Sequence, residues 1–95
     1  MRPVMHGDLT SAARHLLALP AAARPEHCAC LITQADAADR YRKRFGRVHP
    51  RWGNGTLMAA ARRIPLPPEP PLHDPAYASC LLLVLTAIIQ RRPPA

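Results

Sequence analysis

Aromatic residues are scarce in this chain of 95 residues, which contains one Trp, one Phe and two Tyr. Glycine is also scarce, with four residues, whereas proline contributes twelve. A core of this composition has to be built from Leu, Ile and Ala, and the prolines must interrupt its elements often. Because 95 residues suffice for one modest core, we expect a single domain over residues 1–95.

Acidic residues are few, with six Asp and Glu against thirteen Lys and Arg, and the formal net charge is +7. Such a surface attracts phosphate groups, nucleic acid or an acidic partner. The apolar stretch 76–89 would reach about 21 Å as a helix, which is short of the ~30 Å hydrocarbon core of a bilayer. The apolar run 16–23 is at the short limit for a signal peptide, because Asp8, Arg14 and His15 precede it and leave only about eight apolar residues. We therefore expect a cytoplasmic protein that is not associated with a membrane.

Cysteine is limited to three residues, and Cys28 and Cys30 form a C-x-C pair rather than a C-x-x-C motif. We expect free thiols in a reducing interior. His27 and Cys30 lie one helical turn apart, but no second pair has the spacing of a metal site, so no metal or cofactor is expected. Paired carboxylates and an activated Ser or Cys are also missing, and we expect that the protein is not an enzyme.

Apolar residues recur with helical spacing in four segments. The pattern predicts a helix capped by Asp8 and ended by Pro20, a second over residues 25–46, a short third over 56–64 and a fourth over about 75–91. Residues 65–75 hold six prolines and should form a rigid, extended connector. The predicted fold class is all-α, a small bundle of about four short helices with a Pro-rich connector.

The fourth predicted helix is the most apolar of the four. Its residues Tyr77, Cys80 and Val84 follow the helical pattern, and Leu82 and Ile89 widen the apolar arc, while Leu83 is expected on the far side. An arc this wide is typical of a central helix or of a surface that contacts a partner. We expect this helix to be central, with Trp52 at the edge of the core.

Four basic residues recur on the second predicted helix at the spacing of one helical stripe: Arg40, Lys43, Arg44 and Arg47. Asp36 and Asp39 precede Arg40 and Lys43 by four residues, a spacing that favours ion pairs. Tyr41, Phe45 and Trp52 lie nearby, and basic residues interleaved with aromatic ones are typical of nucleic-acid binding. A solvated helix face in an arginine-rich chain explains the same pattern.

The segment HPRWGNGT, residues 49–56, holds the only tryptophan between a proline and two glycines. Its candidate binding residues are His49, Arg51, Trp52, Asn54 and Thr56, because Gly-rich backbone before a helix can hold an anion. The alternative is a structural role, in which Gly53 or Asn54 caps the next helix and Trp52 packs on Leu57.

Three motifs give the chain a resemblance to a known group of proteins: MRPVxHGD at residues 1–8, HPRWGNGTLM at 49–58 and DPxYxxCL at 74–81. The chain resembles a small family of uncharacterised bacterial proteins. This resemblance covers most of the chain and implies a free-standing cytosolic protein. It implies no reaction or ligand for His49, Arg51 or Trp52.

Two functions are compatible with these observations. The first is a non-catalytic protein–protein interaction module, whose partner is an unknown protein or a second copy that contacts the last helix. The alternative is a nucleic-acid or phosphate-binding protein that uses the basic helix 40–51 and the 49–56 loop.

Overall fold

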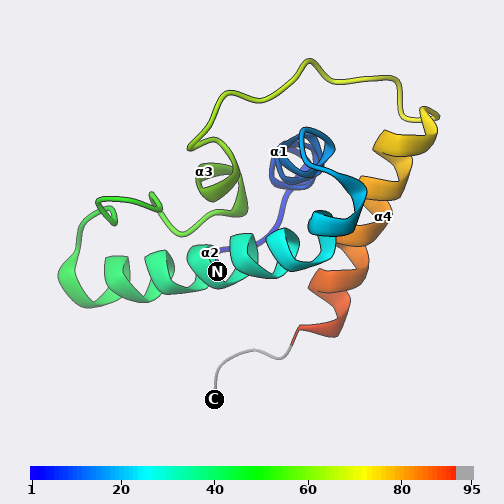
Figure 1. The fold of residues 1–95 in the computed structure, drawn as a ribbon. Coiled ribbons are helices and arrows are strands. Elements are labelled where there is room, and N and C mark those ends of the chain that lie inside the picture. Colours follow the sequence, from blue (N-terminus) through cyan, green and yellow to red (C-terminus); the bar gives the residue numbers. More distant parts are fainter. Residues whose placement is uncertain (92–95) are drawn as a thin grey trace.

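Four α-helices and one short 3-10 helix make up the computed structural model, which describes residues 1–91 (Figure 1). They are α1 (His6–Leu17), the 3-10 helix η1 (Ala21–Ala23), α2 (Arg24–Phe45), α3 (Leu57–Ala61) and α4 (Pro75–Gln90). No β-strand occurs within these 91 residues. The predicted all-α class with about four helices is confirmed. Residues 92–95 of the expected domain lie outside the part that the structure describes.

The helix ends follow from local chemistry. Pro25 lies in the first turn of α2, and Gly46 ends that helix with a left-handed backbone (φ 69°). The Asp74 carboxylate accepts a hydrogen bond from the Tyr77 amide and caps α4. These ends agree with the prediction. The third helix is shorter than predicted, because it ends at Ala61 rather than Ile64.

The central helix is α1, which packs against α2, α3 and α4 (Figure 1). Its buried residues Ser11, Ala12 and Ala13 are small, so neighbouring helices can approach it from several sides. The expectation that the last helix is central was therefore wrong. The core contains mostly small and aliphatic side chains from all four helices: Ala12, Ala13, Leu16, Cys28, Leu31, Ile32, Ala35, Leu57, Ala60, Tyr77, Cys80 and Val84.

The face of α4 that packs against the core differs from the predicted one. Tyr77, Cys80 and Val84 are buried, and Leu83 packs half-buried against the core instead of lying on the far side. Leu82 and Ile89 are 66% and 80% exposed, because the buried face is centred on Val84 and they project almost opposite to it. No helix within residues 1–91 is both long and apolar enough to cross a bilayer.

The connector between α3 and α4 has no helix or strand, as its prolines predict. It is held at two points: Arg14 Nε donates to the Pro67 carbonyl (2.7 Å), and the Tyr77 hydroxyl donates to Glu69 Oε2 (2.6 Å). Burial and the adjacent Glu69 carboxylate raise the pKa of Tyr77 to about 12. The connector thus lies across α1 and α4 at defined places.

The buried carboxylate of Asp8 joins the starts of α1 and α3. Its Oδ2 accepts from the Met5 amide (2.8 Å) at the N-terminus of α1, and its Oδ1 accepts from the Met58 amide (2.9 Å) in the first turn of α3. Asp8 was expected to precede α1 as its cap. Instead α1 begins at His6, and Asp8 reaches back from the first turn while it also bonds an amide 50 residues away.

Replacing Asp8 with Ala should therefore destabilise the fold more than removing an ordinary helix cap. We expect a loss of about 2–4 kcal/mol in the free energy of unfolding, because two backbone amides at the starts of different helices lose one buried, charged acceptor. The urea midpoint measures this loss. Asp74→Ala, which removes one cap bond, is the matched control, with an expected loss of about 1 kcal/mol. A loss for Asp8→Ala no greater than that for Asp74→Ala would contradict the bridging role.

Candidate functional site

The C-terminal end of α2, residues 40–45, extends beyond the part of the bundle that contains the core (Figure 1). The last buried residue of α2 is Asp39, and none of residues 40–45 is buried. The chain then turns at Gly46 and runs back alongside the helix. We call residues 40–53 the arm. It contains the predicted basic stripe and most of the HPRWGNGT loop.

The HPRWGNGT loop closes on itself through His49. The backbones of His49 and Gly53 exchange two hydrogen bonds (2.9 and 3.2 Å). The His49 ring nitrogen Nδ1 accepts from the amides of Arg51 and Trp52, both at 3.1 Å. His49 therefore acts as an internal acceptor that fixes the turn, and the amides of residues 51–53 are already bonded within it.

The start of α3 is capped by Thr56, not by Gly53 or Asn54 as expected. Thr56 Oγ1 accepts from the Ala59 amide (3.1 Å), and Asn54 Oδ1 accepts from both the amide and the hydroxyl of Thr56 (3.1 and 2.7 Å). The Met58 amide is bonded to Asp8. Three backbone donors at this helix start, the amides of Thr56, Met58 and Ala59, are thus bonded to protein side chains.

Two glycines allow the loop to pack closely on its neighbours. Gly53 and Gly55 have positive φ angles of 82° and 92°. A Cβ atom at Gly53 would lie 2.7 Å from Ala59 Cβ, and one at Gly55 would lie 2.8 Å from Asp39 Cα. The Gly55 carbonyl also accepts from the Arg2 amide (2.8 Å). The loop is thereby held against α2 and α3.

Four rings form a continuous row along the arm. Phe45 and Tyr41 have centroids 4.7 Å apart, Tyr41 and His49 meet edge to face at 4.9 Å, and His49 stacks on Trp52 at 4.8 Å with 5° between the planes. Trp52 is half-buried and is not part of the core, so its expected place at the core edge was wrong. The signal for this row in the sequence was the i, i+4 spacing of Tyr41 and Phe45, but it did not reveal His49 as the link.

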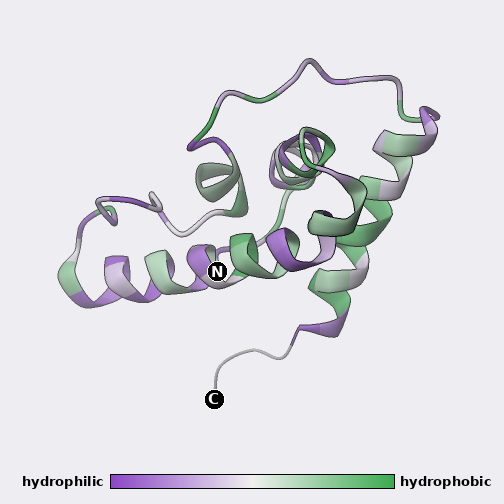
Figure 2. Ribbon diagram, in the orientation of Figure 1, coloured by the Kyte–Doolittle hydropathy of each residue, from purple (hydrophilic) through white to green (hydrophobic). Residues whose placement is uncertain are grey.

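The positive charges of the arm differ in their surroundings. Arg40, Arg44, Arg47 and Arg51 are exposed, and none has an acidic partner within 4 Å in residues 1–91. Arg44 lies over the Phe45 ring, 5.4 Å from its centroid. Figure 2 shows hydrophilic residues along the outer half of α2 and in the following loop. The arm therefore presents unpaired cations beside aromatic rings.

The predicted ion pairs are confirmed only in part. Asp39 pairs with Lys43 (3.2 Å) as expected, and also with Arg42 (3.0 Å). Asp36 does not pair with Arg40, because the N-terminal ammonium group and Arg91 contact its carboxylate instead. Arg47 lies beyond Gly46 and so is not on the helical stripe. Lys43 is consequently less available to a ligand than the four arginines.

Asp39 lies where the arm begins and forms ion pairs with Arg42 and Lys43. Burial by itself would raise the pKa of Asp39, but hydrogen bonds from Arg42 and Lys43 outweigh it and hold the pKa below its ordinary value. A carboxylate with a lowered pKa in the folded state stabilises the fold above its unfolded pKa, and this stabilisation disappears as the pH falls through the folded pKa. The base of the arm should therefore loosen in acid.

The Asp39→Asn variant should be less stable than the parent protein at pH 7 by about 1–2 kcal/mol, since it loses charged acceptors near Arg42 and Lys43. It should also lose less stability between pH 7 and pH 2.5 than the parent does. Urea midpoints at both pH values measure the difference. Glu26→Gln changes an exposed acid in the first turn of the same helix and should alter either value by no more than about 0.5 kcal/mol. Parallel pH curves for Asp39→Asn and the parent would refute this assignment.

The His and Cys residues considered for zinc lie near the start of α2, where Cys30 also borders a hollow next to Trp52. His27 and Cys30 border a hollow of about 300 Å³ together with His15, whose Nδ1 lies 2.9 Å from the Ala61 carbonyl oxygen. In the part of the chain that the structure describes, no three His, Cys, Asp or Glu side chains are grouped as metal ligands. Cys28 and Cys80 are buried, Cys30 is exposed, and all three are free thiols.

Comparison with known proteins identifies a family and nothing more specific. Residues 2–88 match the family model described as domain of unknown function DUF7742. No curated protein and no solved structure matches the chain. Because the family model covers nearly the whole length, the chain belongs to the DUF7742 family.

Proposed function

We propose that this protein is a non-catalytic nucleic-acid-binding protein and that the arm is its binding surface. The observation that carries the proposal is the group of four exposed arginines, Arg40, Arg44, Arg47 and Arg51, which lack acidic partners within residues 1–91 and lie beside a row of aromatic rings. Arginine is suited to phosphate because its planar guanidinium group offers several donors.

The alternative explanation is that the basic residues of the arm only form a solvated helix face. It accounts less well for the positions of the arginine and aromatic residues in the chain. Arg14 donates to a backbone carbonyl of the connector, Arg24 donates to backbone carbonyls at and just after the end of α1, and Arg91 is bonded to Asp36. Those arginines stabilise the fold, whereas the exposed ones on the arm form no such bonds to any of residues 1–91. Moreover, three of the four Phe, Tyr and Trp residues of the chain lie on the arm, and only Tyr77 is in the core.

The net charge of +7 supports the same function. Neutralising phosphates releases condensed counterions, so a surface of this kind binds nucleic acid strongly at low salt. The three free thiols support a reducing compartment, and we place the protein in the bacterial cytoplasm, in accord with the motif resemblance. Nucleic acid is present in that compartment as a partner for the arm.

Arg44→Gln/Arg47→Gln tests this proposal. At 50 mM salt, affinity for a fluorescein-labelled 20-nucleotide oligomer, measured by anisotropy, should fall more than tenfold. The slope of log affinity against log salt should decrease by about 1–2, because one to two phosphate contacts are lost. Arg2→Gln/Arg62→Gln removes the same charge from two exposed arginines outside the arm and should cost less than threefold. Equal losses for the two variants, or no binding by the parent protein, would refute the proposal.

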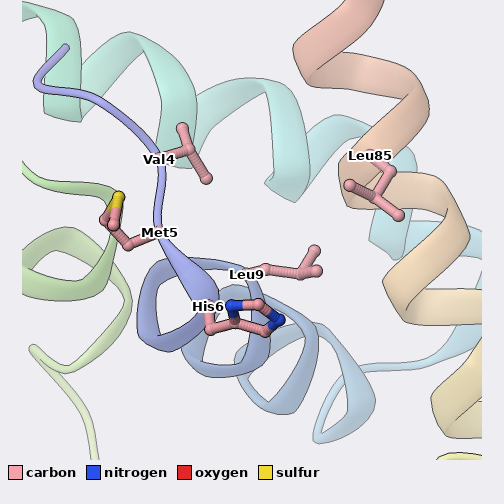
Figure 3. Close-up of a pocket in the computed structure, with 5 residues that line it drawn as sticks. All are labelled: Val4, Met5, His6, Leu9 and Leu85. Atoms are coloured by element: carbon pink, nitrogen blue, oxygen red, sulfur yellow. The ribbon is translucent and has the colours of Figure 1, made fainter.

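A second candidate function, protein–protein interaction through α4, rests on a different surface. Leu82, Leu85 and Ile89 are exposed at spacings of three and four residues, which is the spacing of a helix-pairing seam. Leu85 also borders a hollow of about 270 Å³, where it faces Leu9 and Val4 (Figure 3). We propose a second copy as the occupant, since an uncharged seam can pair with itself across a two-fold axis.

Leu82→Glu tests this pairing. If two α4 helices associate, the variant should shift the protein from dimer to monomer, as measured by light scattering after size-exclusion chromatography. Leu72→Glu is a closely matched control, because Leu72 lies in the connector and is exposed to the same fraction, 66%. This control should leave the dimer intact. A parent protein that stays monomeric at the highest accessible concentration would refute the pairing.

A further inference from the structure

We infer that the arm binds single-stranded nucleic acid and that unpaired bases stack on its exposed rings. This inference rests on the proposed function and specifies the form of nucleic acid. The arm offers two kinds of contact in one place: cations for phosphates and ring faces for bases. Only a single strand presents free base faces together with phosphates.

Phe45 is the accessible end of the aromatic row. Its side chain is 52% exposed, whereas Tyr41, His49 and Trp52 are half-buried. The Tyr41 ring centroid lies 4.7 Å from that of Phe45, and the Arg44 guanidinium carbon lies over the Phe45 ring, 5.4 Å from its centroid, so the ring is supported while it remains partly open to solvent. A base stacked on Phe45 would have its phosphate within reach of the Arg44 guanidinium group.

Trp52 provides the second position. It forms one wall of a hollow of about 370 Å³, whose other walls are α2 residues that include Thr33, Gln34 and Glu26. Glu26 disfavours a phosphate there, but its carboxylate and the Thr33 and Gln34 side chains can hydrogen-bond to the edge of a base. The hollow therefore suits a base, while the arginines farther along the arm suit the backbone.

The shape of the arm argues against a duplex. The loop lies alongside α2, since the His49 ring contacts Tyr41 and Gly55 approaches Asp39. A lone helix of about 10–12 Å diameter fills the major groove, which is about 12 Å wide. A helix with a loop packed along its side is wider than that groove. The row of rings would also remain unused on a duplex, whose bases are stacked on each other.

The test compares three labelled ligands with the same backbone charge per strand: a 12-nucleotide single strand, the same strand with abasic sites throughout its centre, and the blunt duplex. Each is made in DNA and in RNA, and the ligands are titrated with the full chain at 100 mM salt. Base stacking on an aromatic ring changes affinity by about 5- to 140-fold per base. The single strand should therefore bind at least tenfold more tightly than the abasic strand and the duplex, in DNA or in RNA.

Phe45→Leu keeps an apolar side chain but removes the ring. It should weaken binding of the intact single strand at least fivefold and leave binding of the abasic strand unchanged. Val48→Ala, at a 56% exposed position of the same arm, is the control and should change neither. Trp52 is the only tryptophan, so its emission reports directly on stacking and should be quenched by the intact strand but not by the abasic one.

The outcomes separate this inference from the proposed function. Equal affinity for the intact strand, the abasic strand and the duplex would overturn base stacking but would leave phosphate binding by the arm in place. The same conclusion follows if Phe45→Leu weakens the intact and abasic strands equally. If the parent protein binds none of the three ligands, both proposals are overturned.

Discussion

The structure depends on the buried Asp8 carboxylate, which bonds the starts of two helices that are far apart in the sequence. Its two oxygens accept from the Met5 and Met58 amides, so the N-terminal ends of α1 and α3 meet at one charge. Helix N-termini carry a partial positive charge, and a carboxylate between two of them is stabilised by both. The Met58 side chain also packs directly over Gly7, which has no Cβ to obstruct it. These contacts determine where α3 begins.

The position of α3 in turn determines the geometry of the arm. Thr56 caps α3, and the two preceding residues bond to it or pack on Asp39, so the loop has to return along α2 rather than extend into solvent. His49 then lies between Tyr41 and Trp52 and joins the rings of the helix to those of the loop. The arginines of the arm consequently lie on a loop and helix that are packed against each other.

Much of the secondary structure could be predicted because its causes are local. Pro25, Gly46 and Asp74 act on residues within one helical turn, and the helix boundaries that they predicted agree closely with those observed. The candidate site was predicted less completely. The arginines and aromatics were recognised as a group, but the roles of His49 as an internal acceptor and of Thr56 as the cap depend on how the loop closes.

The sequence by itself determined the all-α class, the ends of α2 and α4, and the concentration of basic residues in one segment, because each of these follows from spacing and composition. Only the tertiary structure decided that α1 is central, that Leu83 faces the core, that Asp36 pairs with Arg91, and that the rings of the arm form one row. These features join residues from different segments. Which of these residues contact each other is decided by shape and burial when the helices pack. The spacing of residues along the chain does not predict these contacts.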